Sequence, residues 1–366
     1  MHGGGAERVV VNLLRGFVHH GCRVDLLLVD PRGPLLGEVS PEVRIVRLAG
    51  GRIIASLPSL IAYLRRERPG ALLSHLDTIN LVALWARRAA GVDTRVVVTT
   101  HIALEQHSRS GPLRGRLVNL LVNRLYGWAD AVVGVSEGVT TELARRISPG
   151  STELRTIYNP IVTDQLLERA RKHPGDVADA PLPGISADSR VILSVGRLTP
   201  QKNQALLIDA FADVAGRTPD LLLVILGEGP ERGRLLTRAK ARGLADRVLL
   251  PGFVLDPSPY FRRASVFALS SDWEGLPTVL IEALAFGCQI VSTRCPTGPA
   301  EILADGTYGR LVPTADAAAL GSAVLDALRD PLPPALLRQR ALDFSAERSV
   351  SRYVDVLFGP TGAGGT

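Results

Sequence analysis

The chain has 366 residues, of which 46% are apolar and 21% are charged. At about 100–200 residues per domain this length predicts two domains, and the composition excludes an intrinsically disordered chain. The formal net charge is +6, and the three cysteines (Cys22, Cys288 and Cys295) are too few and too scattered for a disulfide framework or a zinc site.

The first residues, Met1 to Glu7, contain no apolar core of a signal peptide. No apolar run approaches the ~18–20 residues that are needed to cross a bilayer. We therefore expect a cytoplasmic protein that is neither secreted through a signal peptide nor integral to a membrane.

Short apolar runs alternate with helical patterns in the first half of the chain. A helical pattern at Ala6–His20 comes first, and runs rich in Val, Ile and Leu follow it. The strands predicted from these runs are Arg23–Val29, Val43–Leu48, Ala71–His75, Arg95–Thr100, Ala131–Val135 and Arg155–Tyr158.

The glycine-rich turn Gly3-Gly4-Gly5 stands at the start of the sequence. In doubly wound α/β domains a strand normally precedes such a turn. We therefore expect the first strand of the N-terminal domain to be missing. Either the domain does without this strand or the natural start lies upstream, which is the reading we favour.

The pattern restarts after a stretch at 174–189 that is rich in Pro, Gly and Asp. Continuous apolar strands separated by helices indicate parallel sheets that are covered on both faces. Two such series predict an α/β protein with two doubly wound domains. The strands predicted in the second series are Val191–Val195, Leu221–Leu226, Val248–Leu250, Val266–Leu269 and Gln289–Ser292.

The predicted domains differ in charge. Residues 1–165 hold 20 arginines and 14 acidic residues, whereas the rest of the chain holds 22 basic and 22 acidic residues. An anionic partner of the first domain, a nucleic acid or a membrane surface, would explain this excess. The expected organisation is an N-terminal domain at 1–165, a linker at 166–189, a C-terminal domain at 190–340, a last helix at 341–358 and a disordered tail at 359–366.

The loop after the predicted strand Val191–Val195 carries two cations. Arg197 and Lys202 lie five residues apart, so both can reach one anion, the first as a bidentate fork and the second as a point charge. Ligands of open α/β sheets bind at such loops. The alternative is a solvated loop with ordinary charges, but lysine is scarce here, with only three in the chain.

A second motif spans residues 272–287. Its sequence predicts a turn followed by a helix that begins at Pro277 and stops at Gly287. The backbone N–H groups near the helix start would point at a bound phosphate. Glu274 before the helix and Glu282 within it are near enough in sequence to share one ligand. An amphipathic surface helix would explain Glu282 alone but not both carboxylates.

Three weaker signals follow other strands. The turn at Gly227 allows close approach of a ligand, and the backbone at Gly252 and Phe253 can line a nucleobase slot. His101 ends the strand Arg95–Thr100. A lone histidine is usually structural, but this one lies at the carboxyl end of a strand, where ligands bind.

Together these motifs resemble the retaining glycosyltransferases of family four, which have the GT-B fold. Arg197, Lys202 and the E-x₇-E pair are specific in combination, whereas each motif alone is not. The resemblance implies two facing Rossmann-like domains, with the acceptor mainly in the first, the nucleotide sugar in the second, and a last helix that crosses back to the first. The matching motifs cover nearly the whole chain in order: Gly3–Arg8, Ser194–Lys202, Leu226–Pro230, Pro251–Phe253, Glu274/Glu282 and Gly298–Ile302.

The resemblance also implies roles for individual residues. Arg197 and Lys202 would neutralise the diphosphate, Glu274 would contact the donor sugar near the reacting carbon, and Glu282 would hold the ribose hydroxyls. His101 would contact the donor sugar and complete the catalytic set. No metal and no cofactor is implied. The donor-binding residues would be Gly4, Gly5, Gly227, Gly252, Phe253, Gly275, Leu276, Pro277, Thr278 and Glu282.

The function implied is a retaining, metal-independent hexosyltransferase. It would move a hexose or N-acetylhexosamine from a nucleotide sugar, with a UDP-sugar favoured, to a glycan or polyprenyl-linked acceptor of cell-envelope polysaccharide or glycolipid synthesis. The alternatives are a GDP-mannose-dependent mannosyltransferase, a GT-B epimerase or phosphorylase, and a non-catalytic GT-B binding subunit. Nucleic-acid binding has only the net charge in its favour, without a recognition motif, and is not expected.

The segment 109–128 alternates arginines with leucines and ends at Trp128. Such a basic amphipathic stretch can lie on an anionic bilayer, although an ordinary helix packed on the domain core explains it as well. Our hypothesis is that the first domain is peripheral at the inner face of the cell membrane. The candidate membrane or acceptor contacts are Arg109, Arg114, Arg116 and Arg124.

Overall fold

A computed structural model describes residues 4–102, 112–147, 152–172, 182–186 and 188–359. The chain divides into two compact units: unit 1 comprises Met1–Pro160 and Ala346–Thr366, and unit 2 comprises Ile161–Ser345. The division after Pro160 falls five residues before the predicted domain end at 165. The predicted disordered tail lies outside the described residues except for Gly359.

Unit 1 contains parallel strands in two separate sheets. One sheet has the order β1-β2 and the other β3-β4-β5-β6, all with parallel neighbours. Each predicted apolar run contains or overlaps one strand, but β1 begins two residues after the predicted Arg23 and β6 begins two residues before the predicted Arg155. The strands are β1 (Asp25–Leu28), β2 (Arg44–Arg47), β3 (Ala71–His75), β4 (Arg95–Thr100), β5 (Ala131–Gly134) and β6 (Glu153–Thr156).

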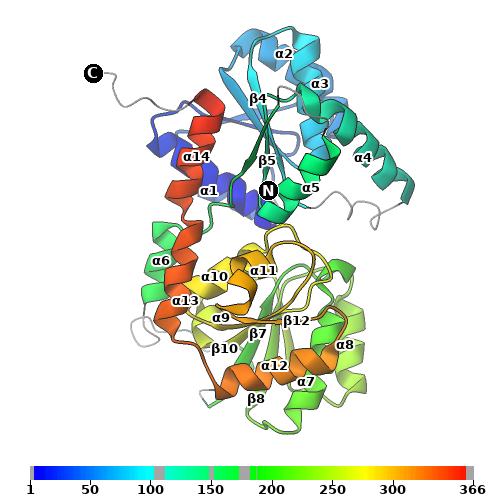
Figure 1. Ribbon diagram of the computed structural model, residues 1–366, viewed down its shortest axis with the longest axis vertical. Coiled ribbons are helices and arrows are strands. Elements are labelled where there is room, and N and C mark those ends of the chain that lie inside the picture. The colour runs from blue at the N-terminus through cyan, green and yellow to red at the C-terminus, as the bar shows by residue number, and fades with distance from the viewer. Residues whose placement is uncertain (1–3, 103–111, 148–151, 173–181, 187, 360–366) are drawn as a thin grey trace. The chain divides into compact units, whose positions relative to one another are not determined.

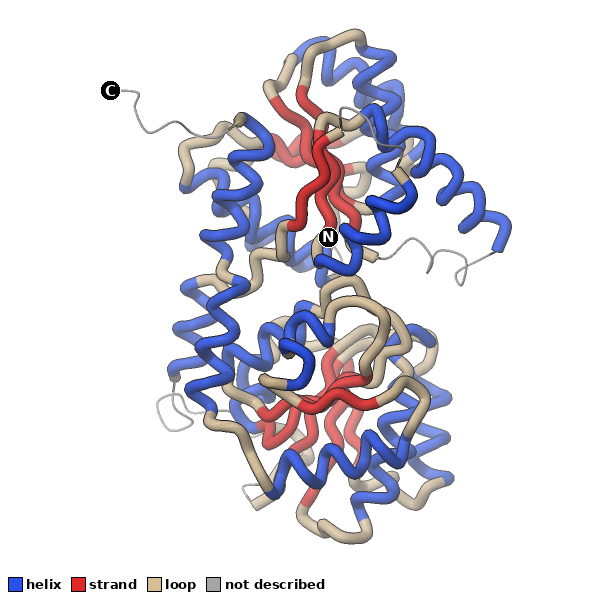
Figure 2. Tube along the Cα trace, viewed as in Figure 1, coloured by secondary structure: helices blue, strands red, loops and turns tan. Residues whose placement is uncertain are grey.

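Helices cover both faces of these strands (Figures 1 and 2). The helices α1 and α14 pack together on one face, where a Cβ atom at Gly16 would lie 2.3 Å from Cγ2 of Val350, so only glycine fits there. The helices α3, α4 and α5 enclose the apolar core on the other face. The helices are α1 (Gly5–His19), α2 (Leu57–Glu67), α3 (Asp77–Ala90), α4 (Pro112–Leu125), α5 (Glu137–Arg146) and α14 (Ala346–Phe358).

The described residues begin at Gly4, and α1 is the first element in them. Within the described residues, no strand pairs β1-β2 with β3-β4-β5-β6. A cavity of about 590 Å³ is lined by β1 on one side and β3 on the other.

Unit 2 has one continuous, all-parallel sheet of six strands with the order β12-β11-β10-β7-β8-β9. This is the doubly wound order in which β7 and β10 are the central neighbours. The sequence missed β12, because its three residues are too short to stand out as an apolar run. The strands are β7 (Arg190–Val195), β8 (Leu221–Leu226), β9 (Val248–Gly252), β10 (Ala264–Leu269), β11 (Gln289–Thr293) and β12 (Arg310–Val312).

The helices of unit 2 also lie on both faces of its sheet (Figures 1 and 2). The helices α7, α8 and α12 share the main apolar core with the strands. The helix α6 occupies part of the predicted linker: the Thr163 hydroxyl caps it by accepting a bond from the Leu166 N–H at 3.2 Å. The helices are α6 (Asp164–Arg171), α7 (Gln204–Ala215), α8 (Arg232–Ala241), α9 (Ser258–Arg263), α10 (Thr278–Phe286), α11 (Pro299–Ile302), α12 (Ala317–Arg329) and α13 (Pro334–Ala341).

The described residues contain no helix that is long and apolar enough to span a membrane. Unit 1 includes α14, so the chain returns to its first unit after completing the second. The predicted last helix at 341–358 is shorter in the structure, because α13 ends at Ala341 and α14 begins at Ala346.

Candidate active site

The candidate site of unit 2 lies at the switch point of its sheet. The strand order reverses between β7 and β10, and ligands of open α/β sheets bind at the carboxyl ends of the strands at this place. Lys202 follows β7, and Glu274 follows β10. The topology therefore brings together two residues that are 72 positions apart in the sequence.

Hydrogen bonds join the two loops that carry these residues. The Asp272 N–H donates to the Gln201 carbonyl at 2.9 Å, and the Gln201 side chain donates to the Trp273 carbonyl, also at 2.9 Å. The Asn203 amide donates to the Asp272 carboxylate at 3.0 Å. Because these bonds run in both directions between the loops, they fix the loops' relative positions.

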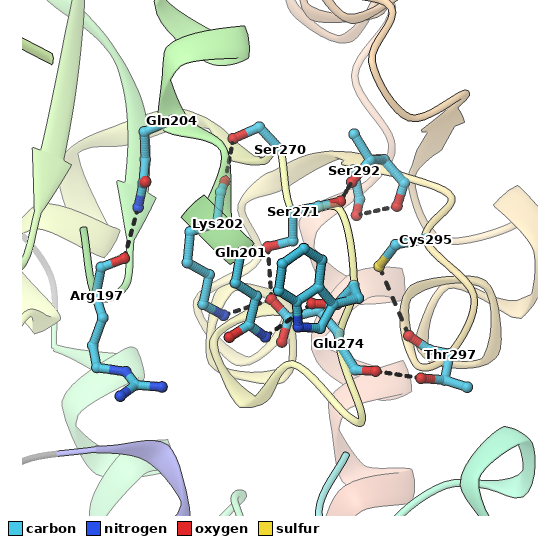
Figure 3. A network of polar contacts seen from close by, with 12 residues as sticks. Arg197, Gln201, Lys202, Gln204, Ser270, Ser271, Glu274, Ser292, Cys295 and Thr297 are labelled. Carbon is cyan, nitrogen blue, oxygen red and sulfur yellow. Dashed lines mark hydrogen bonds and ion pairs between the residues drawn. The ribbon is translucent and has the colours of Figure 1, made fainter. Parts of the chain in front are cut away.

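The Lys202 ammonium and the Glu274 carboxylate form an ion pair, with 2.5 Å between Nζ and Oε1 (Figure 3). The same Oε1 accepts a hydrogen bond from the Ser271 hydroxyl at 2.6 Å. Glu274 is only 6% exposed, so its charge needs these partners. The ammonium has three donors, of which this pair uses one, and Oε2 of Glu274 takes part in neither bond.

The Glu274 loop is also braced from the side of β11. The Thr297 hydroxyl donates a hydrogen bond to the Glu274 carbonyl oxygen. Gly298 has a φ of +91°, and a Cβ atom there would lie 2.5 Å from Cδ of Pro277. A side chain at Gly298 would thus push the loop out of position, so this glycine is required for close packing of the backbone.

Arg197 lies on the Lys202 loop, but its side chain is exposed. Its carbonyl oxygen accepts a hydrogen bond from the Gln204 side chain at 3.0 Å. In Figure 3 its guanidinium group lies apart from Lys202 and Glu274 and takes part in none of the marked bonds. Among the described residues it forms no ion pair, so it is available to an anion from solution.

The helix α10 begins at Thr278, with Pro277 as its N-cap, one residue later than predicted. It ends at Gly287 as predicted, where a φ of +77° favours glycine. Its N-terminus therefore follows directly after Gly275 and Leu276 in the Glu274 loop. Glu282 is the fifth residue of α10 and is half-buried.

The glycines after β8 and β9 are explained by contacts within the protein. A Cβ atom at Gly227 would lie 2.0 Å from the Gly196 carbonyl oxygen, and its N–H donates to the Gly252 carbonyl at 2.8 Å. A Cβ atom at Gly252 would meet the Glu228 carboxylate. The predicted approach of a ligand is therefore not needed to explain Gly227 or Gly252. Phe253, which follows β9, is 49% exposed.

In unit 1, His101 follows β4 and meets a second histidine. Its Nε2 lies 3.0 Å from Nδ1 of His75, the last residue of the neighbouring strand β3. Burial lowers the pKa of His101 to about 4, against an opposing effect of Asp77, and burial lowers the pKa of His75 as well. Both rings are therefore uncharged at neutral pH, and one donates the shared hydrogen bond to the other.

A buried polar network lies beside this pair. The carboxylate of Asp77 accepts hydrogen bonds from the Tyr126 hydroxyl at 2.6 Å and the Thr100 hydroxyl at 3.1 Å. Asn80 donates to the Thr99 carbonyl at 2.9 Å and to the Tyr126 hydroxyl at 2.9 Å. These bonds fix the carboxyl end of β4, from which His101 emerges.

The glycine turn of unit 1 begins α1. Gly4 is the N-cap of the helix, and its N–H donates to the Glu7 carboxylate at 2.8 Å. Gly5 is the first helical residue. The N–H of Gly4, for which the resemblance implies a phosphate contact, thus has a partner within the protein.

The helix α4 buries one face and exposes the other. Val122 and Leu125 are in the apolar core, whereas Leu117 and Leu120 are 56% and 62% exposed. Arg116 and Arg124 are exposed as well. The spacing of 116, 117, 120 and 124 places these four side chains on one side of a helix. Arg109 and the side chain of Arg114 lie outside the described residues.

The fold matches that of solved glycosyltransferases. A sucrose-phosphate synthase from Thermosynechococcus elongatus superimposes with a TM-score of 0.79 and 23% identity, over 96% of this chain and 92% of that one. The lipopolysaccharide outer core galactosyltransferase WaaB gives a TM-score of 0.70 and 18% identity over 98% and 97% of the two chains. The fold is therefore GT-B, as the sequence predicts.

Family models match both halves of the chain. Residues 3–165 match "Glycosyltransferase Family 4", and residues 181–343 match "Glycosyl transferases group 1". The chain therefore belongs to the glycosyltransferases, with a family 4 domain followed by a group 1 domain.

Among curated relatives, an N-acetylgalactosamine-N,N'-diacetylbacillosaminyl-diphospho-undecaprenol 4-alpha-N-acetylgalactosaminyltransferase of Campylobacter jejuni is 34% identical over 65% of this chain and 61% of that protein. The lipopolysaccharide core biosynthesis glycosyltransferase LpsE of Rhizobium meliloti is 28% identical over 97% and 96% of the two chains. The alignment with the Campylobacter protein thus covers about three fifths of that relative.

Sequence reasoning missed the residues that position the site. Ser271 and Thr297 bond to Glu274, and His75 bonds to His101. Serine and threonine near a carboxylate are too common to stand out in a sequence. His75 carried a usable signal, because it ends a strand just as His101 does, and parallel neighbouring strands end at the same edge.

Proposed function

We propose that this protein is a retaining glycosyltransferase of cell-envelope polysaccharide or glycolipid assembly. It would transfer a hexose or N-acetylhexosamine from a nucleotide sugar to a glycan or polyprenyl-linked acceptor. The observation that carries the proposal is the Lys202–Glu274 pair at the switch point of unit 2. It places a cation for a diphosphate next to a carboxylate for the donor sugar.

The proposed reaction breaks the bond between the anomeric carbon and the departing phosphate oxygen. Negative charge then grows on the nucleoside diphosphate and positive charge on the sugar. The acceptor oxygen attacks the anomeric carbon from the face that the phosphate leaves, and its proton passes to the departing phosphate oxygen. The new bond then has the configuration of the old one, and the products are the glycoside and the free nucleoside diphosphate.

In this proposal Lys202 and Arg197 neutralise the diphosphate, together with the N-terminus of α10. Lys202 keeps one bond to Glu274 and still has two donors for phosphate oxygens. Arg197 has no ion-pair partner among the described residues, so binding of the diphosphate requires no bond of its guanidinium to break. Preorganised cations of this kind act where charge develops in the transition state.

Glu274 would support the positive charge on the sugar. Its Oε1 is held by Lys202 and Ser271, which leaves Oε2 to face a ligand. Glu282 would bind the ribose hydroxyls, and Gly275, Leu276 and Thr278 would supply backbone contacts to the phosphates. The family resemblance also implies that His101 would contact the donor sugar, and it would do so as a neutral imidazole that shares a hydrogen bond with His75. The proposal requires no metal.

We favour a UDP-sugar as donor, and the exposed ring of Phe253 offers a stacking surface for its base. A GDP-mannose donor is the second candidate. It is supported by a GDP-mannose-dependent mannosyltransferase of Mycolicibacterium smegmatis that is 35% identical over 69% of this chain and 65% of that protein.

The lipid-linked acceptor is supported by the Campylobacter relative, whose name specifies a diphospho-undecaprenol substrate. The exposed face of α4 supports a position at the membrane, because two exposed leucines flanked by arginines can enter the surface of an anionic bilayer. This surface, formed by Arg116, Leu117, Leu120 and Arg124, is called the α4 face below.

The test is an assay of nucleotide release with a panel of UDP- and GDP-sugars, each with and without an undecaprenyl-diphosphate-linked acceptor. We expect release from one donor to rise when the acceptor is present, with the anomeric configuration of the donor kept in the product as read by NMR. A product of inverted configuration would overturn the retaining mechanism. Binding of nucleotides without release from any donor would favour the non-catalytic subunit instead.

A further inference from the structure

We infer that His75 is a positioning residue: its Nδ1 accepts the Nε2–H of His101, which leaves Nδ1 of His101 as a bare acceptor for a hydroxyl group of the donor sugar. The inference rests on the proposed function, which gives His101 a contact with that sugar. It adds a second residue to this contact and states in which direction the hydrogen bonds of the two rings run.

The two rings meet through one directional contact. His75 is the last residue of β3, and its Cα partner in β4 is Thr99, so His101 emerges two residues further along the neighbouring strand. Nδ1 of His75 lies 3.0 Å from Nε2 of His101, with the ring centroids 5.2 Å apart and the ring planes at 45°. The tilt and the short distance between the nitrogens indicate a hydrogen bond rather than stacking.

The chemistry of neutral imidazoles restricts this bond to two arrangements. Burial lowers the pKa of both histidines, that of His101 to about 4, so each ring has one N–H group and one bare nitrogen at pH 7. Either His101 donates from Nε2 or His75 donates from Nδ1. The tautomers of the two rings are therefore linked, because only one of the two facing nitrogens can carry a proton.

The intrinsic preference of the side chain selects between these arrangements. A neutral histidine favours the tautomer that carries its proton on Nε2. When His101 donates, both rings have this tautomer, because His75 accepts at Nδ1 and keeps its own proton on Nε2. When His75 donates, both rings take the disfavoured tautomer. The first arrangement is thus favoured by both rings, and it leaves Nδ1 of His101 without a proton.

Nδ1 of His101 is available to a ligand. Among the described residues, His75 is the only hydrogen-bond partner of the His101 ring. His101 is partly exposed and follows the carboxyl end of a parallel strand, where ligands of open α/β sheets bind. A bare ring nitrogen accepts a hydrogen bond from a hydroxyl group, and hexoses and N-acetylhexosamines carry several of these groups.

The backbone next to His75 is held in an unfavourable conformation. Leu76 connects the end of β3 to the start of α3 with a φ of +74°, which is costly for a residue that has a Cβ atom. The side chain of Leu76 is 44% exposed, so its own packing does not offset this cost. The bonds of its neighbours do so instead: His75 meets His101, and the Asp77 carboxylate accepts from the Tyr126 hydroxyl. Strain of this kind is typical of functional sites.

One side chain ties the ends of both strands together. Asn80 accepts a hydrogen bond from the Ser74 hydroxyl at 2.7 Å and donates to the Thr99 carbonyl at 2.9 Å. Ser74 directly precedes His75, and Thr99 lies two residues before His101. The backbones that carry the two rings are thus fixed relative to each other, and the bond between the rings restrains the remaining rotation of the side chains.

The first test reads the tautomers without any substrate. NMR of the full chain with isotope-labelled histidine shows which ring nitrogen is protonated at pH 7, and His101→Gln identifies the His101 signals by their loss. We expect the proton on Nε2 in both His75 and His101. His20 is the internal reference, because its Nδ1 faces the Gly16 carbonyl at 2.9 Å and can only donate there. A proton on Nδ1 of His101 would overturn the inference.

The second test measures sugar transfer. His75→Leu keeps an apolar side chain of similar bulk but removes the acceptor, whereas His75→Asn keeps a side-chain oxygen near the former position of Nδ1. We expect His75→Leu to lower kcat about 10–100-fold and to change the Kd of the nucleoside diphosphate by less than about twofold, since only a positioned contact is lost. His75→Asn should recover most of the rate. His20→Leu is the matched control, and an unchanged kcat in His75→Leu would contradict the inference.

A double variant separates positioning from a structural role. If His75 acts through His101, then His75→Leu combined with His101→Ala is no slower than His101→Ala alone. If the two losses multiply, His75 acts independently of His101 and the inference is wrong.

Donor analogues test the direction of the bond to the sugar. Nucleotide sugars in which one hydroxyl is replaced by fluorine keep their shape but cannot donate at that position. We expect one analogue to react about tenfold more slowly in the unchanged chain than in His101→Ala, each relative to the natural donor, because one hydrogen bond is lost. The comparison cancels the electron-withdrawing effect of fluorine, which both chains share. Equal relative rates for every analogue in the two chains would refute an acceptor role of His101.

These experiments separate this inference from the proposed function. If the unchanged chain transfers no sugar from any donor, the proposed function fails and the positioning role fails with it, whereas the NMR spectrum still decides the direction of the bond between the rings. If sugar is transferred and His75→Leu leaves kcat unchanged, only the present inference fails.

Discussion

Units 1 and 2 are built on the same doubly wound plan, but they differ in continuity and charge. The sheet of unit 2 runs unbroken through six strands, and its candidate site lies at the switch point, where Lys202 and Glu274 form an ion pair. The sheet of unit 1 is divided into two and four strands, and the histidines at its carboxyl edge are uncharged. The excess positive charge of the chain lies in its first 165 residues.

The two units therefore hold their candidate residues in different ways: an ion pair joins the residues of unit 2, whereas the histidines of unit 1 are uncharged. In unit 2, hydrogen bonds between the Lys202 and Glu274 loops hold the polar groups in place before any ligand arrives. In unit 1, buried polar groups such as Asp77 and Tyr126 brace the end of β4. We expect loss of a charge to affect activity most in unit 2, whereas uptake of protons by the buried histidines and loss of exposed apolar side chains should act mainly in unit 1.

The largest effect is expected at Glu274. Replacing Glu274→Gln keeps the shape and the bond from Ser271 but removes the charge that supports the sugar, and Glu274→Ala removes both. We expect transfer to fall by about 10³-fold or more in each variant, whereas binding of the nucleoside diphosphate survives. Steady-state kinetics and calorimetry measure the two quantities. Full activity in either variant would contradict the assignment of this site.

The next largest effect is expected for the two cations. Lys202→Ala should slow transfer by about 10²–10³-fold, because a preorganised cation next to the departing diphosphate is lost. Arg197→Ala should have a smaller effect, about tenfold, since its exposed group is screened by water. Lys240→Ala is the matched control, because Lys240 is exposed on α8. If the Lys240 and Lys202 variants had equal rates, the role of Lys202 would be refuted.

The strands and the site loops were largely predictable from the sequence. Runs such as Leu221–Leu226 are apolar throughout and almost entirely buried, so they stand out without any knowledge of the fold. Arg197 and Lys202 stood out because a strand and a helix flank them and because lysine is rare. The helix start at Pro277 was predicted to within one residue from proline and glycine signals.

What the sequence could not predict depends on contacts between distant residues. The bond between Lys202 and Glu274 requires β7 and β10 to be neighbours in the sheet. The local pattern of apolar residues predicts each strand but does not predict which strands are neighbours. The need for glycine at Gly298 depends on Pro277, which is 21 positions away. The predicted linker at 166–189 included six of the eight residues of α6, which the structure shows to be a helix capped by Thr163.

The pH dependence of stability should differ between the units. The pKa of His101 is about 4 in the folded state, whereas an unfolded histidine titrates near 6.5. The unfolded state therefore binds more protons in this window, so the free energy of unfolding falls as pH decreases from about 6.5 to 4. His75, whose pKa is also lowered by burial, adds to the same loss.

Hydrogen exchange at pH 7 and pH 5 measures this difference between the units. We expect protection of β4 in unit 1 to drop at pH 5, whereas β8 in unit 2, which has no histidine among its described residues, keeps its protection. The exposed His19 serves as control, and His19→Gln should leave the drop unchanged. An equal loss in both units would show that carboxylates such as Asp25 and Asp209, whose pKa values are lowered by arginine partners, cause the effect instead.

The smallest effect is expected for the α4 face. Leu117→Ser and Leu120→Ser remove apolar groups that are already more than half exposed, so stability should change little. If this face enters a bilayer, each change should weaken flotation with anionic vesicles by about three- to tenfold, since part of a leucine's transfer free energy is lost. Leu236→Ser, at an exposed leucine of α8 in unit 2, is the matched control.

The α4 variants therefore separate the two explanations of this helix, a contact with an anionic bilayer and an ordinary helix packed on the domain core. If Leu117→Ser weakens vesicle binding and Leu236→Ser does not, the binding surface lies in unit 1, and Arg116→Gln should weaken binding further at low salt. If Leu117→Ser and Leu236→Ser both bind vesicles as the unchanged chain does, the contact of α4 with the bilayer is either purely electrostatic or absent. Arg116→Gln and Arg124→Gln distinguish these cases, because they remove the salt dependence of vesicle binding only if the contact is electrostatic. Equal weakening by the leucine changes in both units would contradict a membrane role for α4, because binding would then follow exposed apolar surface in general.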